Sequence, residues 1–169
     1  MKGTIKMAKS KDKDVKTNAM RMLERNHIQF EVNTYECEEF IDGLTVAKHN
    51  GQNPEQSYKT LVTEGKSKNY YVFVIPIAEE LDLKKAAKSV GEKSVEMIHV
   101  KDINKITGYI RGGCTPLGMK KQYVTVVDSS AEKWDKIIIS GGRIGSQIIL
   151  NPHDLIKVVN GKFEEIIFN

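Results

Sequence analysis

Residues 70–77, with the sequence Tyr70-Tyr71-Val72-Phe73-Val74-Ile75-Pro76-Ile77, form an almost unbroken apolar run near the middle of the 169-residue chain. Aromatic and β-branched residues dominate the run, and these residue types favour strands. A strand that is apolar at nearly every position is buried on both faces, so we expect a central strand here. A second strand is expected over 60–63, and Glu64-Gly65-Lys66 predicts a hairpin turn between the two.

Helices and strands alternate along the rest of the chain. Apolar residues at helical spacing predict a helix over 15–26, and alternating apolar residues predict a strand over 28–35. Thr45 is expected to cap a short helix that ends near Gly51, before a turn at Asn53-Pro54. Three more helices are expected over 83–90 (capped by Asp82 and closed by Gly91), 100–106 and 152–159 (capped by Asn151). Further strands are expected over 122–127, 137–140, 148–150 and 166–168.

The irregular spacing of these strands argues against a regular doubly wound sheet. We therefore expect an α/β (α+β) fold in which helices surround a curved, mixed and partly barrel-like sheet. No linker or internal repeat divides the chain, so residues 15–169 are expected to form one domain. The Lys-rich residues 1–14 lack the apolar core of a secretory signal, which predicts a disordered tail and a cytoplasmic protein; Met7 is an alternative start.

Composition excludes several classes of protein. Hydrophobic residues make up 40% and charged residues 28% of the chain, which is typical of a folded domain without membrane spans. The two cysteines, Cys37 and Cys114, predict no disulfide framework, and the four histidines are scattered rather than paired as metal ligands. We expect no metal, cofactor or membrane association. The net charge of +4 permits an anionic partner without requiring one.

Two glycine-rich segments are candidates for a binding site, namely residues 108–118 and residues 140–145 (Ser140-Gly141-Gly142-Arg143-Ile144-Gly145). Glycines let a ligand approach the backbone, whose N–H groups can then hold an anion or a carbonyl oxygen. Tight turns are the commoner explanation for one glycine pair, but two such segments in one domain favour a site. Neither segment matches a nucleotide-binding fingerprint, which argues against nucleotide-dependent phosphoryl transfer.

Lys59 lies where a polar turn gives way to a predicted strand. An ammonium at a strand end can neutralise a phosphate or polarise an ester, although a surface lysine is the commoner case. The usual nucleophilic arrangements are weak in this sequence. Cys114 has no histidine near it along the chain, so a buried, inert thiol is the favoured interpretation. His27 and His153 are expected to be surface or core residues rather than bases.

Five segments in order resemble the YbaK/EbsC family, the stand-alone relatives of the editing domain in bacterial prolyl-tRNA synthetases. They are Thr34-Tyr35-Glu36, Asn53-Pro54-Glu55-Gln56-Ser57-Tyr58-Lys59-Thr60-Leu61, Leu81-Asp82-Leu83-Lys84-Lys85-Ala86-Ala87-Lys88, and the two glycine-rich segments. The resemblance runs from about residue 15 to the end of the chain. It implies the YbaK and prolyl-tRNA synthetase editing-domain fold. It also implies an aminoacyl-tRNA deacylase that clears mischarged tRNA, above all Cys-tRNA(Pro) and also Cys-tRNA(Cys).

The resemblance further implies roles for individual residues. Lys59 matches the family's essential lysine, which is expected to hold the phosphate or ribose end of the acceptor. Gly112 matches a glycine whose backbone contacts the substrate near the ester, and Ser140 matches a serine that helps to fix the aminoacyl-adenosine. Gln147 stands where some members carry Asp, so a neutral amide replaces a charge for the substrate's amino group. The substrate-binding residues implied in this way are Tyr35, Thr60, Gly112, Gly113, Ser140, Gly141 and Gln147.

Members of this type resemble enzymes that work without a protein nucleophile. The substrate's own thiol attacks the ester and releases a cyclic thiolactone, which agrees with the weak sequence signal for a catalytic triad. The implied partners are the acceptor end of mischarged tRNA and prolyl-tRNA synthetase. Two alternatives stay open: a deacylase for another small amino acid such as alanine, and a non-catalytic accessory protein that binds tRNA ends or a synthetase.

Overall fold

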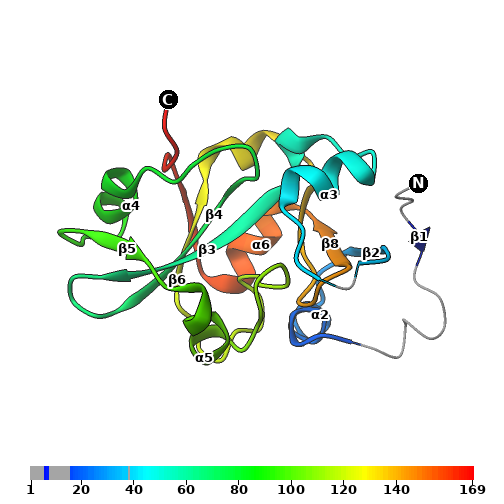
Figure 1. The fold of residues 1–169 in the computed structure, drawn as a ribbon, viewed down its shortest axis with the longest axis horizontal. Coiled ribbons are helices and arrows are strands. Elements are labelled where there is room, and N and C mark those ends of the chain that lie inside the picture. The colour runs from blue at the N-terminus through cyan, green and yellow to red at the C-terminus, as the bar shows by residue number, and fades with distance from the viewer. Residues whose placement is uncertain (1–5, 8–15, 38) are drawn as a thin grey trace.

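Two β-sheets form the centre of the protein, and helices pack around them (Figure 1). The computed structural model describes residues 6–7, 16–37 and 39–169. The first sheet has the strand order β1 (Lys6–Met7), β2 (Glu31–Thr34), β8 (Ser146–Leu150) and β7 (Ile137–Ser140). The second has the order β5 (Val95–Met97), β3 (Tyr58–Gly65), β4 (Tyr70–Pro76), β6 (Val124–Asp128) and β9 (Lys162–Glu164).

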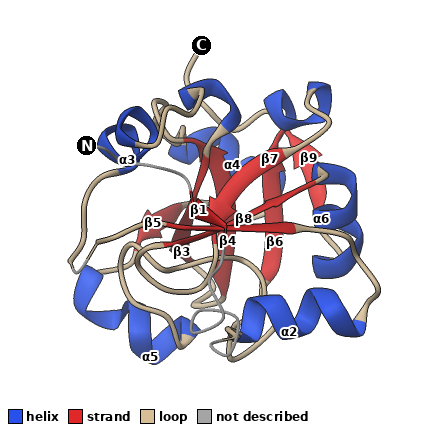
Figure 2. Cartoon of the chain, turned by 90° about the vertical axis from the view of Figure 1, so that its right-hand side faces the viewer, coloured by secondary structure: helices blue, strands red, loops and turns tan. Residues whose placement is uncertain are grey.

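Helices cover the outside of both sheets, as Figure 2 shows. They are α2 (Asn18–Arg25), α3 (Gly43–His49), α4 (Leu83–Ser89), α5 (Ile103–Thr107) and α6 (Pro152–Val159), with short 3₁₀ helices η1 (Pro54–Gln56), η2 (Val100–Asp102) and η3 (Ser129–Lys133). None of the helices in the described part of the chain has the length and hydropathy that a bilayer crossing requires. The expected α/β fold with a mixed sheet and surrounding helices is confirmed.

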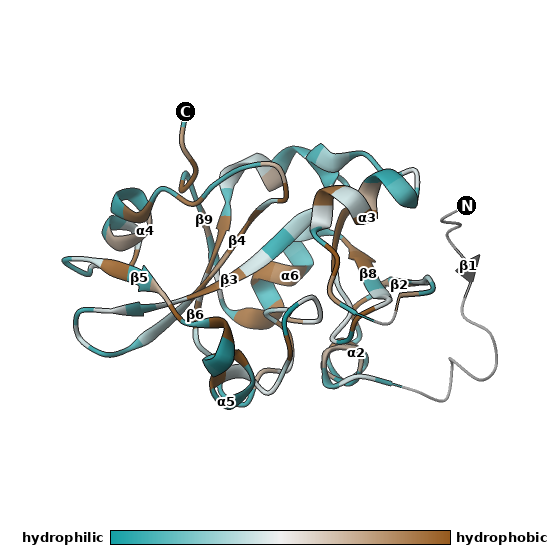
Figure 3. Cartoon of the chain, in the orientation of Figure 1, coloured by the Kyte–Doolittle hydropathy of each residue, from teal (hydrophilic) through white to brown (hydrophobic). Residues whose placement is uncertain are grey.

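The strand β4 is the central strand that the apolar run predicts. It lies between β3, to which it is antiparallel, and β6, to which it is parallel. Val72 and Val74 are fully buried in one hydrophobic cluster, while Phe73 and Ile75 are fully buried in a second cluster on the opposite face. Complete burial of each such side chain stabilises the fold by about 1.5–3 kcal/mol. Figure 3 shows the resulting contrast between apolar β4 and the hydrophilic exterior of α4.

The two sheets meet at the start of β3. An isolated parallel bridge pairs Ser57, just before β3, with Ile138 of β7. Beyond this bridge the two strands separate, so the sheet is not one closed barrel but two sheets joined edge to edge. Such a separation leaves a gap between β3 and β7, and this gap positions the site described below.

Several local predictions need correction. Asp42 rather than Thr45 caps α3, because its carboxylate accepts hydrogen bonds from the Thr45 N–H and Oγ1, both at 2.9 Å. The last full strand is β9; residues 166–168 form only an isolated antiparallel bridge, between Ile167 and Leu81, and the Ile166 N–H donates to the buried Asp128 Oδ1. The strand β5 was not predicted at all. The caps Asp82 and Asn151 are confirmed.

Only two residues of the predicted N-terminal tail, Lys6 and Met7, are described by the structure. Lys6–Met7 pairs with β2 as a short edge strand, with Lys6 opposite Thr34 and Met7 opposite Asn33. Residues 1–5 and 8–15 lie outside the described residues, so the predicted division into a tail over 1–14 and a domain over 15–169 stays a prediction.

Candidate active site

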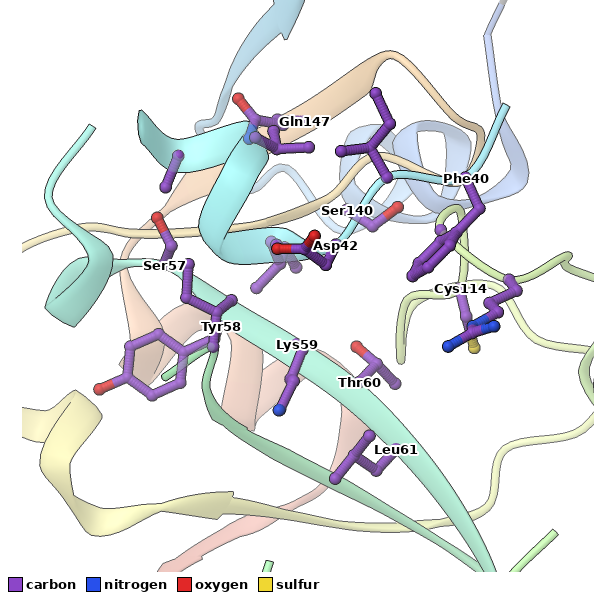
Figure 4. Close-up of a pocket in the computed structure, with 18 of the residues that line it drawn as sticks. Phe40, Asp42, Ser57, Tyr58, Lys59, Thr60, Leu61, Cys114, Ser140 and Gln147 are labelled. Carbon is purple, nitrogen blue, oxygen red and sulfur yellow. The ribbon is translucent and has the colours of Figure 1, made fainter. Parts of the chain in front are cut away.

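A pocket of about 470 Å³ lies at the junction of the two sheets (Figure 4). Its walls are the first half of β3, the end of β7 and the start of β8, the segment 40–47 that includes the first turns of α3, the segment 97–103, and the first glycine-rich segment. The pocket therefore occupies the gap that opens where β3 and β7 separate. Six of the eight residues that the sequence indicates for the site line it: Tyr35, Lys59, Thr60, Gly112, Ser140 and Gln147.

Gly113 and Gly141 are not among the lining residues. A Cβ atom on Gly113 would lie 2.8 Å from the Cα of Arg143, so this glycine lets the two glycine-rich segments pack against each other. The Gly141 N–H donates to the Ser146 carbonyl at 2.8 Å, and the Gly141 carbonyl accepts a hydrogen bond from Thr17 Oγ1 at 2.6 Å. Both glycines thus hold the wall of the pocket in place from behind.

Gly112 has a conformation and a setting that only glycine tolerates well. Its φ of +88° lies in the left-handed region, which costs a residue with a Cβ roughly 1–2 kcal/mol. A Cβ here would also lie 3.1 Å from Phe40 Cδ1 and 3.2 Å from Ile144 Cγ1. Gly112 therefore brings bare backbone to the pocket wall between the two glycine-rich segments, as the sequence suggests.

Lys59 and Thr60 are neighbours in sequence but project from opposite faces of β3, because side chains alternate along a strand. Lys59 shares a face with Ser57 and with its cross-strand partner Ile75. Thr60 shares the other face with Val62, which packs in the larger hydrophobic cluster. Both residues line the pocket, so the pocket wraps around the edge of β3. In Figure 4 the Lys59 ammonium points away from Ser140 and Gln147.

The charge on Lys59 is subject to two opposing effects. Burial lowers the pKa of Lys59 below its usual value, because a half-buried ammonium loses hydration. The carboxylates of Glu80 and Glu79 act in the opposite direction and partly restore it. Lys59 thus supplies a positive charge at the pocket, but two acidic neighbours offset part of its field.

The edge of β3 carries unused hydrogen-bonding groups toward the pocket. The Val62 carbonyl accepts from the Ile98 N–H at 3.2 Å, so it faces away from β4, and the Thr60 backbone two residues earlier faces the same way. The ladder with β5 covers Thr63 to Gly65 and does not reach Thr60. Within the described chain, Thr60 Oγ1 and Ser146 Oγ are also buried without a hydrogen-bond partner. Unsatisfied buried groups at a pocket wall are places where a ligand can bind.

Gln147 lies at a closed, neutral end of the pocket. Its side-chain amide pairs reciprocally with that of Gln52: Gln52 Nε2 donates to Gln147 Oε1 at 2.7 Å, and Gln147 Nε2 donates to Gln52 Oε1 at 3.1 Å. Gln147 is only 8% exposed. The amide that stands in place of an acidic residue is therefore already engaged with a partner 95 positions away in sequence.

Cys114 lines the pocket, but its chemistry is not that of a nucleophile. Burial raises the pKa of the Cys114 thiol to about 11, although a hydrogen bond with the Thr107 side chain acts in the opposite direction. The thiolate is the nucleophilic form of cysteine, and at neutral pH almost none of it is present at this pKa. The inert thiol expected from the sequence agrees with this environment.

Sequence reasoning missed the segment 40–47, which lines the pocket with the residues just before α3 and with the first turns of that helix. Phe40, Ile41 and Leu44 are each at least 40% exposed at its mouth. The guanidinium of Arg111 lies 4.0 Å from the centroid of the Phe40 ring, a cation–π contact that ties this segment to the first glycine-rich segment. Arg111 could have been found by its place among the glycines, whereas Phe40 carries no local signal. In the described chain no group of His, Cys, Asp or Glu side chains suits a metal ion.

Comparison with known proteins identifies the family to which this fold and pocket belong. The family described as "Aminoacyl-tRNA editing domain" matches residues 43–158, which include β3, both glycine-rich segments and most of the pocket. The chain belongs to the aminoacyl-tRNA editing domain family. The family membership predicted from the five sequence segments is thereby confirmed.

This editing domain is also similar to one curated protein in sequence and to two solved structures in fold. It is 45% identical over 161 residues to "Putative Cys-tRNA(Pro)/Cys-tRNA(Cys) deacylase EbsC" from Enterococcus faecalis, and the match covers 95% of this chain and 98% of the relative. Its fold matches the protein in "Crystal structure of a putative trans-editing enzyme for prolyl tRNA synthetase", with a TM-score of 0.76, 20% identity, and coverage of 89% and 93%. It also matches the protein in "Crystal structure of hypothetical protein APE2540", with a TM-score of 0.80, 19% identity, and coverage of 88% and 97%.

Proposed function

We propose that this editing domain is an aminoacyl-tRNA deacylase that clears cysteine from Cys-tRNA(Pro), and also from Cys-tRNA(Cys). The observation that carries the proposal is the near full-length relative at 45% identity whose name states these two substrates. The pocket supports it, because about 470 Å³ suits an amino acid with part of a terminal nucleoside. Lys59 and Ser140 both line that pocket, as the resemblance to the YbaK/EbsC family implies.

The proposed reaction uses the thiol of the substrate as the nucleophile. The cysteinyl sulfur attacks the carbonyl carbon of its own ester, and the bond from this carbon to the ribose oxygen breaks. The thiol proton passes to the ribose oxygen, so the products are tRNA with a free terminal hydroxyl and a cyclic thiolactone. The protonated state of Cys114 supports this route, since the cysteine at the pocket wall is a poor nucleophile near neutral pH.

The chain's own residues then orient the substrate rather than bond to it. Lys59 supplies a positive charge for the phosphate or ribose oxygens of the terminal adenosine. Bare backbone at Gly112 allows the ester to approach closely. Thr60 Oγ1 and Ser146 Oγ, which have no partner within the described chain, are available to hydrogen-bond the aminoacyl group.

The partners and the location follow from the proposed substrate. Charged tRNA is made by synthetases, so we propose that the protein works in the cytoplasm on tRNA delivered by prolyl-tRNA synthetase. The likeness of fold to a protein described as a trans-editing enzyme for that synthetase is consistent with this partner.

The test compares three esters of one tRNA: Cys-tRNA(Pro), Ser-tRNA(Pro) and Ala-tRNA(Pro), each incubated with the purified protein. We expect loss of the cysteinyl ester alone, because serine replaces the thiol by a much less acidic hydroxyl and alanine has no nucleophile. The thiolactone, or the product of its capture by an added amine, should appear at the same rate as the ester disappears.

Release of alanine at a comparable rate would contradict the thiol mechanism and favour a deacylase for small amino acids. If no ester is cleaved faster than in buffer while tRNA is still bound, the deacylase proposal fails and a non-catalytic binder of tRNA ends replaces it.

A further inference from the structure

The two sides of the pocket mouth come from segments of opposite charge. Residues 31–47 hold five acidic residues and no Lys or Arg; the acids are Glu31, Glu36, Glu38, Glu39 and Asp42. Residues 97–127 hold five basic residues and one acidic residue; the bases are Lys101, Lys105, Arg111, Lys120 and Lys121, and the acid is Asp102. Both segments contribute lining residues, such as Phe40 and Asp42 from the first and Val100 and Arg111 from the second. Of the described acids, Asp42 lines the pocket, Glu36 and Glu39 are exposed next to the lining residues Tyr35 and Phe40, and Glu31 is ion-paired with Lys136. The pocket therefore opens between an acidic rim, made of Glu36, Glu39 and Asp42, and a basic rim.

Most of the basic residues lie on elements that pack against one another. The Lys120 N–H donates to the Thr107 carbonyl at 3.0 Å, and Lys120 Nζ donates to the Lys105 carbonyl at 3.1 Å. These bonds pack the loop after the first glycine-rich segment against α5, which follows directly on η2. All five basic residues are exposed: Lys101, Lys105, Arg111, Lys120 and Lys121. We call these five residues the basic face.

Little negative charge offsets the basic face from within its own segment. Asp102 forms an ion pair with Lys105 at 3.7 Å. Among the described residues, no ion pair is found for Lys101, Lys121 or Arg111. The segment thus carries a net charge of +4, from five positive charges and one negative charge, which equals the net charge of the whole chain.

Lys59 alone is a weak anchor for a polyanion. Its positive charge lies near Glu79 and Glu80, and a phosphodiester chain that passed them would be repelled. The acidic rim would repel a phosphodiester chain in the same way. If the end of a nucleic acid enters the pocket, the rest of its chain is therefore expected to leave the pocket mouth over the basic face, where its phosphates are attracted.

We propose that the acceptor arm of tRNA lies on the basic face, across η2, α5 and residues 108–121, when its aminoacylated end occupies the pocket. This inference rests on the proposed function for the identity of the RNA. The surface recognises phosphates and not bases, because exposed lysines act as point charges without a fixed geometry. The acidic rim sets the direction of docking by excluding the opposite path.

The test removes two charges without removing known contacts. The double variant Lys101→Gln/Lys121→Gln changes residues of the basic face for which no hydrogen bond or ion pair is found in the described chain. The matched control, Lys84→Gln/Lys88→Gln, removes two exposed lysines from α4, which lies apart from α5 in Figure 1. Uncharged tRNA is titrated with each protein at several salt concentrations, and deacylation of Cys-tRNA(Pro) and of cysteinyl-adenosine is measured in parallel.

We expect the basic-face variant to weaken tRNA binding and to raise KM for Cys-tRNA(Pro) by roughly threefold to tenfold. The slope of log affinity against log salt should become shallower by about 1–2, since each lost phosphate contact releases fewer counterions. Cleavage of cysteinyl-adenosine, which has no phosphate, should not change. The control should behave as the unmodified protein in all three measurements.

Equal effects of the two double variants, or no effect of either, would overturn the docking surface and favour a synthetase that holds the RNA by itself. A protein that binds tRNA through the basic face but cleaves no ester would support the docking surface while refuting the proposed function. The two proposals can thus fail independently.

Discussion

The two faces of β3 differ sharply at adjacent residues. On one face Lys59 brings a partly buried positive charge near Glu79 and Glu80. On the other face, which is neutral at this position, Thr60 brings a hydroxyl that is buried and unpaired in the described chain to a wall that includes Cys114, whose thiol pKa is raised by burial. Because Lys59 and Thr60 both line the pocket, we expect one substrate to contact both faces of the strand. The contrast teaches that charge and hydrogen bonding are separated in this site, so they can be removed one at a time.

The charged face should give the largest effect. We expect Lys59→Ala to lower the rate of Cys-tRNA(Pro) deacylation by about 100-fold or more, as loss of a positive group beside developing charge does. Lys59→Arg should keep part of the activity, and circular dichroism should show that both variants fold. Activity should fall as pH rises through the pKa of Lys59, at lower pH than an unburied lysine would give, because burial lowers that pKa. An active, folded Lys59→Ala variant would remove Lys59 from the mechanism.

A substitution at Gly112, in the glycine-rich wall of the pocket, should give the second-largest effect on deacylation. Gly112→Ala introduces a side chain at a φ of +88° and crowds Phe40 and Ile144, so we expect deacylation to fall by about tenfold. Gly91→Ala is the matched control, because Gly91 has a φ of +73° but nothing within 4 Å of its Cβ position. Both variants should lose about 1–2 kcal/mol in free energy of unfolding from the left-handed backbone, and Gly112→Ala somewhat more because of the crowding; urea denaturation measures both. Equal activity of the two variants would contradict a substrate-facing Gly112.

The neutral face should give a smaller effect of a different kind. We expect Thr60→Val to lower kcat/KM by roughly threefold to tenfold without loss of stability, because the hydroxyl has no partner in the described chain. Thr63→Val is the opposite case, since Thr63 Oγ1 donates to the Tyr71 carbonyl at 3.3 Å and lies far along β3. It should lose thermal stability and keep its activity. A destabilised Thr60→Val variant would mean that the hydroxyl is satisfied within the fold.

The thiol on the neutral face should have almost no effect on activity. In a Cys37→Ser background, Cys114 should react slowly with iodoacetamide at pH 8, since a pKa of about 11 leaves about 0.1% thiolate. Cys114→Ala should keep deacylase activity within about twofold. Fast alkylation that abolishes deacylation, together with an inactive Cys114→Ala variant, would instead identify a protein nucleophile.

Local patterns predicted the local structure well. The apolar run over 70–77 became the buried β4, and the caps Asp82 and Asn151 begin α4 and α6. The error at Thr45 is instructive, because Thr45 does take part in the cap of α3, as the donor to Asp42. A cap needs both the acceptor and the helix start, and sequence alone left the choice between the two residues ambiguous.

Long-range features were beyond the sequence. The strand β5 is three residues long and depends on pairing with β3, so no local period marks it. The Gln52–Gln147 pair joins residues far apart in the chain, and the separation of the sheets depends on where Ser57 meets Ile138. The candidate site residues were predicted from the resemblance of the sequence to a family. To predict which face of β3 each residue occupies, one must know where the strand begins. The sequence predicted that start two residues late, at residue 60 instead of Tyr58.

The bridge between Ser57 and Ile138 has a consequence for how such a site can diversify. In the described chain this one pair links the hydrogen-bonded ladders of the two sheets, and the pocket begins just beyond it. A substitution that opens or closes the angle between the sheets therefore alters the width of the cavity without disrupting either ladder. Small changes in side-chain volume beside the bridge can retune which amino acid fits while the scaffold keeps its stability. The joint is a natural point at which to engineer new selectivity into the fold.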